Sequence, residues 1–233
     1  VGDGGQGSES FVYEPLDVTV GPAGNIYITA DNRLRRVDLN GVITTVSGNG
    51  RRGFSGDGSL AFAAQLAEPE SVVVDAQGTI YIADSDNHRV RRIDVTNGII
   101  STVAGVGHSV TRVSTQSTAY SGQHIDFQRE GVGGGYSGDG GPAIEAKLTL
   151  PSGLALGPMG NLFFVDGSLR VRRIDSTGII TTVAAGETVT SYASGKVLVK
   201  TGQIGELASL AVGTSGEMFL TDKKNNVVHK VSP

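Results

Sequence analysis

The chain contains no cysteine among its 233 residues. This absence excludes disulfide bonds, thiolate nucleophiles and zinc sites built on cysteine. Long apolar runs are also missing, since none approaches the ~18 residues that a membrane-spanning helix requires, and no membrane span is predicted. Neither sign of charge predominates, because the chain has 19 basic and 23 acidic residues. A phosphate-binding surface needs clustered lysine and arginine, so this balance disfavours nucleic acid as a partner.

Glycine, by contrast, is abundant, with 35 residues. Typical usage is ~7 %, and the glycines here show no triplet period, which excludes a collagen-like chain. Many tight turns between short strands account for such a composition. The chain is also long enough to bury a substantial core.

The sequence contains four copies of one unit. The first begins with "PLDVTVGPAGNIYITADNRLRRVD" at Pro15, and similar stretches begin at Pro69, Pro151 and Leu207. Each unit consists of short β-type runs separated by turn residues, including an Asn-Gly pair that is a strong hairpin signal. Four antiparallel strands at a fixed period are typical of a propeller blade. The predicted blades cover residues 15–46, 69–104, 151–185 and 207–233.

The fold class predicted from these repeats is an all-β propeller whose strands radiate about one axis. In the first unit we expect strands near residues 16–20, 25–29, 33–38 and 42–46. The first two runs of a unit are apolar on successive residues, which indicates burial on both faces by neighbouring blades. The third and fourth runs are more polar, as outer strands should be. One helical turn is expected near residues 61–66, and another near 143–148.

The units resemble NHL repeats, named for an Asn-His-Leu tripeptide. That tripeptide stands as Asn87-His88-Arg89 in the second unit and as Asn225-Asn226-Val227 in the fourth. The connector "SGDGGPAIEAKLTLPSG" is similar to those of bacterial NHL-repeat proteins and of the propeller of teneurin-like surface proteins. The resemblance covers nearly the whole chain. It implies an exported or cell-surface bacterial protein, and a ring of six blades in which these four are a part.

Two connectors share an unusual glycine turn, "FSGDG" from Phe54 and "YSGDG" from Tyr136. Gly138, Gly140 and Gly141 permit positive φ angles, and Asp57 and Asp139 are expected to cap backbone N–H groups of the turn. Neither turn has the acidic alternation of a calcium loop. The connectors are therefore interpreted as structural crossings between blades.

Both ends of the chain fall inside the repeat. Residues 2–15 match residues 138–151 without a gap, so the chain is expected to begin within a connector, and it ends after the third run of a unit. Each flank would then present apolar side chains that a neighbouring blade should cover. We expect further propeller blades or a second copy of the chain on these flanks.

The face that carries the connectors is the predicted binding face. Strand direction alternates along a blade, so turns between the second and third strands share this face with the connectors, and so do the irregular segments. Variable loops on a rigid scaffold commonly carry binding sites. The candidate binding residues are Arg51, Arg52, His108, Tyr120, His124, Asp126, Phe127 and Tyr136.

The insertion at residues 106–135 contains two histidines and a carboxylate, His108, His124 and Asp126. They lack the spacing of known ligand sets, so neither a metal nor another cofactor is predicted. His88 and His229 stand at repeat positions and are interpreted as structural.

Asp84, Asp166 and Asp222 recur at one repeat position, and Arg-Arg pairs recur nearby. A catalytic group is needed once, whereas an ion pair at a blade edge is needed in every blade. These pairs are therefore predicted to be structural, exposed and worth only ~0–1 kcal/mol each.

The sequence thus predicts a non-catalytic interaction module that binds a protein or glycan partner. One alternative is a propeller enzyme, a lyase or hydrolase with its site at the channel mouth. The innermost runs "DVTV", "SVVVD", "GLALG" and "SLAVG" are mostly apolar or small and contain no histidine, which counts against a metal-dependent lyase. The other alternative is an RNA-binding NHL domain, for which the Arg51-Arg52 pair is a small basic cluster.

Overall fold

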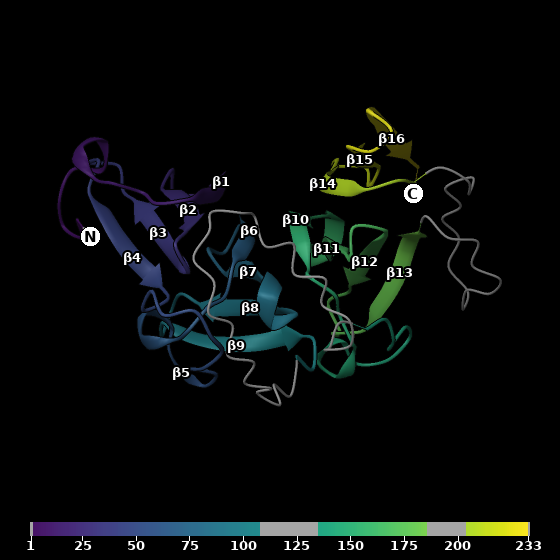
Figure 1. The fold of residues 1–233 in the computed structure, drawn as a ribbon, viewed down its shortest axis with the longest axis horizontal. Coiled ribbons are helices and arrows are strands. Elements are labelled where there is room, and N and C mark those ends of the chain that lie inside the picture. Colours follow the sequence, from purple (N-terminus) through teal and green to yellow (C-terminus); the bar gives the residue numbers. More distant parts are fainter. Residues whose placement is uncertain (1, 108–134, 186–203, 233) are drawn as a thin grey trace, which may run out of the picture.

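A computed structural model describes residues 2–107, 135–185 and 204–232. The strands form antiparallel sheets that follow one another along an arc around a common centre (Figure 1). The innermost strands of successive sheets lie next to one another at this centre. This arrangement confirms the predicted all-β propeller.

The first blade has the strand order β1-β2-β3-β4. Its strands are β1 (Pro15–Val20), β2 (Ile26–Ala30), β3 (Arg33–Val37) and β4 (Ile43–Ser47). The third blade has the same order, with β10 (Ser152–Leu156), β11 (Leu162–Asp166), β12 (Arg170–Ile174) and β13 (Ile180–Ala185). The fourth sheet contains three strands, β14 (Leu207–Val212), β15 (Met218–Asp222) and β16 (Val227–Val231).

The second blade has a fifth strand that the repeat did not predict. Its order is β5-β9-β8-β7-β6. The strands are β5 (Ser59–Leu60), β6 (Pro69–Val74), β7 (Ile80–Asp84), β8 (Arg89–Asp94) and β9 (Ile99–Ala104). The connector supplies β5, which pairs antiparallel with the outer strand β9.

The expected helical turns are shorter than predicted. They are the 3-10 turns η2 (Ala61–Ala63) and η4 (Ala143–Glu145). Three more such turns are η1 (Gly7–Glu9), η3 (Ser85–Asn87) and η5 (Pro158–Gly160). After η2 and η4 the backbone at once becomes extended, because the connector must return across the blade toward its innermost strand.

The apolar core lies between the blades. One cluster joins Tyr27 and Leu34 of the first blade to Val72 and Ile82 of the second. Similar clusters join the second blade to the third and the third to the fourth. The second and third sheets therefore bury apolar side chains against both neighbours, as the continuous apolar runs predicted, and all five residues of β11 are buried.

The face of the first blade that points away from the second blade is exposed. Val18 is 62 % exposed and Val20 is 65 % exposed, whereas Val72, at the same repeat position as Val18, is 1 % exposed. Val72 packs in the cluster between the first and second blades. The exposure of β1 therefore marks the surface on which a blade neighbour would pack.

The glycine turn of the connector is required by conformation and by close packing. Gly138 and Gly140 have positive φ angles of 95° and 81°, as expected, but Gly141 does not. A Cβ atom on Gly138 would lie 2.8 Å from the Cα atom of Ala146, whereas one on Gly140 would meet nothing within 4 Å. Glycine is thus required at position 138 by both backbone conformation and packing, and at position 140 by backbone conformation alone.

This difference predicts unequal costs of alanine substitution. Gly140→Ala should lower the free energy of unfolding by about 1 kcal/mol, because a side chain disfavours the left-handed backbone. Gly138→Ala should cost more, about 2–4 kcal/mol, because the methyl group also displaces the backbone of Ala146. Urea unfolding followed by far-UV circular dichroism measures both. Equal costs would contradict the packing constraint.

Candidate binding face and its buried ion pairs

Turns between second and third strands contact the connectors, as predicted for the binding face. The Asp86 N–H donates to the Ala67 carbonyl at 3.1 Å. The Leu150 N–H donates to Nδ1 of His88 at 3.0 Å, which ties the third blade's connector to the second blade. His88 is 5 % exposed, and this bond agrees with the structural role predicted for it.

The connectors are not confined to that face. The Gly58 N–H donates to the Ile100 carbonyl, and the Ala61 N–H donates to the Gly98 carbonyl, both at 2.9 Å. These contacts lie at the turn between the third and fourth strands, on the opposite face. The expectation of a single connector face was therefore too simple, because the connectors into the first three blades run along the outer strand to the opposite face before they return.

The structure describes three of the candidate binding residues. Arg51 is exposed. Arg52 is ion-paired with Glu68, at 2.9 Å between Nη1 and Oε1, and with Asp86. The candidates that lie outside the described residues are His108, Tyr120, His124, Asp126 and Phe127. Binding by any of these residues stays a prediction.

The third described candidate, Tyr136, is part of a packed cluster. Its hydroxyl lies 2.7 Å from Oδ2 of Asp139 and 2.9 Å from Oγ1 of Thr182. The guanidinium groups of Arg170 and Arg172 lie 4.4 and 4.8 Å from its ring centroid. This geometry is a cation–π stack, and Phe54 makes the equivalent stack in the second blade. Tyr136 therefore has a structural role, although it is 43 % exposed.

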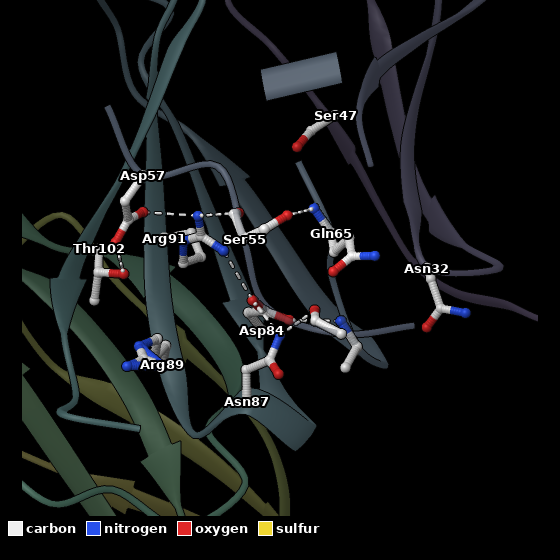
Figure 2. Close-up of polar contacts among 12 residues, drawn as sticks. Asn32, Ser47, Ser55, Asp57, Gln65, Asp84, Asn87, Arg89, Arg91 and Thr102 are labelled. Carbon is white, nitrogen blue, oxygen red and sulfur yellow. Dashed lines mark hydrogen bonds and ion pairs between the residues drawn. The ribbon is translucent and has the colours of Figure 1, made fainter. Parts of the chain in front are cut away.

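The recurring Asp–Arg pairs are buried, which corrects the prediction of exposed pairs at blade edges. Nη1 of Arg91 lies 3.2 Å from Oδ2 of Asp84, and both side chains are 0 % exposed (Figure 2). In the third blade, Nη1 of Arg172 lies 3.0 Å from Oδ2 of Asp166, and both are buried. The connectors cover these pairs, since Phe54 stacks on Arg91 and Tyr136 stacks on Arg172.

Each pair extends to the aspartate of the glycine turn. Nη2 of Arg91 donates to Oδ1 of Asp57 at 2.7 Å, and Oγ1 of Thr102 donates to Oδ2 of Asp57 at 2.7 Å (Figure 2). Asp139 receives the equivalent bond from Arg172 at 2.9 Å. The prediction that Asp57 and Asp139 cap turn backbone was therefore wrong, because their oxygens bind side chains. Those of Asp57 accept from Arg91 and Thr102, and those of Asp139 accept from Arg172, Thr182 and Tyr136.

The inner aspartate also binds the connector backbone. Oδ1 of Asp84 accepts from the Ala67 N–H at 2.8 Å, and Oδ2 accepts from Nδ2 of Asn87 at 2.8 Å. Burial raises the pKa of Asp84 to about 6, against the opposing effects of these bonds and of Arg91. Burial also raises the pKa of Asp166.

The fourth blade uses histidine where the others use arginine. Nε2 of His229 lies 3.1 Å from Oδ2 of Asp222. Asp222 also accepts from the backbone N–H groups of Gly205 and Glu206. Burial works to raise the pKa of Asp222, but these hydrogen bonds outweigh it and hold the pKa below its usual range. His229 therefore lies in a structural pair, as predicted.

The channel between the innermost strands is more polar than the sequence predicted. A cavity of about 270 Å³ there is lined by residues that include Asp17, Glu70, Ser71 and Ser152. Oδ2 of Asp17 accepts from Oγ of Ser71 at 2.8 Å and from the Val72 N–H at 2.9 Å, which joins the first two blades. Burial, and secondarily the charge of Glu68, raises the pKa of Glu70. Glu70 was missed because it precedes the apolar run that identified the strand.

No group of three or more histidine, cysteine, aspartate or glutamate residues is placed to hold a metal ion in residues 2–107, 135–185 and 204–232. Within the same ranges, no helix combines the length and apolar character needed to cross a bilayer.

The fold and the repeated ion pairs define a β-propeller built of NHL-type blades. A family profile described as "Teneurin NHL domain" matches residues 50–129 and 132–197, so the chain belongs to the teneurin NHL domain family. It is 32 % identical to human Teneurin-4 over 178 residues, which are 76 % of this chain and 6 % of that protein. It is 30 % identical to mouse Teneurin-1 over 74 % of this chain and 8 % of that protein. The chain thus spans less than a tenth of these relatives' length.

Solved structures support the fold alone. The virginiamycin B lyase from Staphylococcus aureus aligns with a TM-score of 0.51 and 16 % identity, over 94 % of this chain and 52 % of that one. An auxiliary nutrient binding protein from Bacteroides thetaiotaomicron aligns with a TM-score of 0.54 and 14 % identity, over 90 % and 45 %. One neighbour is an enzyme and the other a binding protein, so the architecture does not decide the function.

The bacterial source that the repeat resemblance implied is not supported. The teneurin relatives come from animals, among them human, mouse, chicken and fruit fly.

The buried pair gives a direct stability prediction. Arg91→Met should lower the free energy of unfolding by about 3–5 kcal/mol, because it leaves Asp84 buried without its guanidinium partner. Arg92→Met, at the next residue on the exposed side of β8, should change it by about 0.5 kcal/mol or less. Urea unfolding followed by circular dichroism compares the two. Adding Asp84→Asn to Arg91→Met should recover part of the lost free energy of unfolding. A double variant that is no more stable than Arg91→Met alone would contradict the charge argument.

Proposed function

We propose that this chain is a non-catalytic interaction module that binds a protein or glycan partner. Its membership of the teneurin NHL domain family supports an interaction role. The buried Asp–Arg pairs support it as well, since they recur in the second and third blades and join connector to blade in each. A catalytic group is needed once, whereas a structural tie is needed in every blade.

The observation that carries the proposal is the contrast between similar blades and one long connector. Strand pairing repeats from blade to blade, and 21 residues lie both between Ser47 and Pro69 and between Ala185 and Leu207, whereas 47 residues lie between Ala104 and Ser152. Length variation on a rigid scaffold is where binding specificity commonly resides. The proposed binding surface is the connector face near the turns that join second and third strands, and Arg51 is one of its exposed cations.

We infer an extracytoplasmic location for this module. The similarity to teneurins, to which the repeat resemblance assigned a cell-surface role, supports it. An extracellular protein or glycan is therefore the partner class to screen.

A binding screen with a face-specific control tests the proposal. The tetramerised protein is applied to arrays of extracellular proteins and of glycans, and the affinity for each hit is measured by surface plasmon resonance. Arg51→Glu should weaken binding at least 10-fold. Val95→Asp adds a negative charge at an exposed position of the opposite face and should leave affinity within 2-fold. The reverse pattern, or no saturable hit on either array, would count against this face.

We also propose that the open flank of β1 packs against a further propeller blade or a second copy of the chain. Leu16, Val18 and Val20 are 46 %, 62 % and 65 % exposed along it. An apolar strip of this kind is unusual on a soluble monomer. The six-bladed ring implied by the NHL resemblance would bury it.

Self-association of the purified protein tests the flank. Sedimentation velocity should detect concentration-dependent association, and Val18→Asp should weaken it at least 10-fold, because a buried unpaired charge is costly. Leu39→Asp, in an exposed turn of the same blade, adds the same charge away from the flank and should leave association unchanged. A monomer at all concentrations would show that a second copy does not cover this face.

A propeller enzyme remains the second candidate, and Glu70 is the observation that favours it. A carboxyl group of raised pKa beside a central cavity has the properties of a general acid. Asp17 in the same cavity is already bound by Ser71 and the Val72 N–H, which favours a structural role for it. The RNA-binding alternative has no such support, since Arg52 is paired with two carboxylates.

A further inference from the structure

The chain contains three Asn-Gly pairs, Asn40-Gly41, Asn49-Gly50 and Asn97-Gly98. In such a pair the backbone nitrogen of the glycine can attack the side-chain amide carbon of the asparagine, because glycine has no side chain to hinder the approach. All three asparagines are exposed. The pairs differ in what the glycine N–H binds, and this difference separates a reactive pair from two protected ones.

Two of the glycines belong to hairpin turns that occupy their N–H groups. The Gly41 N–H donates to the Asp38 carbonyl at 2.9 Å, and the Gly98 N–H donates to the Asp94 carbonyl at 2.7 Å. A nitrogen in such a bond has to leave it before it can lose its proton and attack. Within residues 2–107, 135–185 and 204–232, the Gly50 N–H has no hydrogen-bond acceptor, so it needs no such step.

Asn49 and Asn97 are matched in the position of the side chain. Oδ1 of Asn49 accepts from the Arg51 N–H, and Oδ1 of Asn97 accepts from the Ile99 N–H, both at 2.9 Å. A bond to the N–H two residues ahead folds an asparagine side chain over the intervening peptide. In both pairs the amide carbon is therefore held near the glycine nitrogen, and Asn97 serves as an internal reference for Asn49.

A cation lies against the Asn49–Gly50 peptide. Nη2 of Arg33 donates to the Asn49 carbonyl at 3.4 Å, and a Cβ atom on Gly50 would overlap the Arg33 guanidinium. A positive charge favours the deprotonated form of a nearby acidic group. The guanidinium therefore stabilises the deprotonated Gly50 nitrogen, which is the attacking species, although Asp31 shares this charge through its ion pair with Arg33.

We propose that Asn49 is a deamidation site of the folded protein and is converted to isoaspartate in preference to Asn40 and Asn97. The Gly50 nitrogen gives its proton to hydroxide and attacks Cγ of Asn49. The Cγ–Nδ2 bond breaks, Nδ2 leaves as ammonia with a proton from water, and a cyclic imide remains. Water then opens the ring. Opening at the backbone carbonyl carbon gives isoaspartate, in which the main chain continues through Cγ, and opening at Cγ gives aspartate.

The product alters the proposed binding surface. A neutral amide becomes a carboxylate two residues from the exposed Arg51, and in isoaspartate the main chain gains one methylene group. The hydrogen bond from Nδ2 of Asn49 to the Ala63 carbonyl, at 3.2 Å, is lost. A partner that contacts Arg51 should therefore bind the modified form less tightly. Only this last consequence rests on the proposed function, because the reaction itself requires no partner.

The test is to incubate the purified protein in mildly alkaline buffer and to follow each asparagine by tandem mass spectrometry of tryptic peptides. In the folded protein, Asn49 should deamidate about 10-fold faster than Asn97, the ratio expected when one backbone hydrogen bond has to break first. In guanidinium chloride the two rates should become similar. Equal rates in the folded protein would overturn the proposal, and so would a difference that persists in guanidinium chloride, because it would then come from the local sequence.

Asn49→Gln provides the control variant, and Asn97→Gln is its match. Glutamine keeps the side-chain amide, but its cyclisation through a six-membered ring is slower. Isoaspartate is quantified in aged samples with an isoaspartate methyltransferase and labelled S-adenosylmethionine. Asn49→Gln should lose most of the label that the unmodified sequence incorporates, whereas Asn97→Gln should retain it. Equal label in aged Asn49→Gln and the unmodified sequence would overturn the proposal.

Discussion

The buried guanidinium–carboxylate pair is the interaction that fixes the connector against its blade in the second and third blades. In the second blade, one arginine on the third strand reaches an aspartate that ends the second strand and another in the connector. The inner aspartate in turn binds the connector backbone. A single cation thus fixes three segments that are distant in sequence. Charges buried in this way are costly unless each is paired, so the connector has one favourable position against its blade.

Apolar packing and ion pairing stabilise different parts of the structure. The hydrophobic clusters lie between consecutive sheets and hold one blade against the next. The ion pairs act within a blade and its own connector. The stability of such a repeat is close to the sum of the stabilities of its units and of the interfaces between neighbouring units. The first blade makes only one such interface here, because its β1 side is exposed.

Strands and blades could be predicted from the sequence because period and turn residues are local properties. The depth of a side chain is not local, and for that reason the pairs of Asp84 and Asp166 were predicted at an exposed edge although both lie in the interior. The partner of Asp57 could not be predicted either, since Arg91 is brought to it only by the return of the connector. Recurrence did identify these residues as structural.

The short strand β5 has a consequence for solubility. The outer strand of a propeller blade is a sheet edge, and an unpaired edge offers its N–H and carbonyl groups to any other extended chain. Here the connector pairs with that edge through Ser59 and Leu60. In the first and third blades, bridges from Gln6 to Val42 and from Pro142 to Ile179 occupy the same place. In the first three blades, the segment that leads to the inner strand thus also protects the outer edge from edge-to-edge aggregation, and cleavage within this segment would expose that edge to other extended chains.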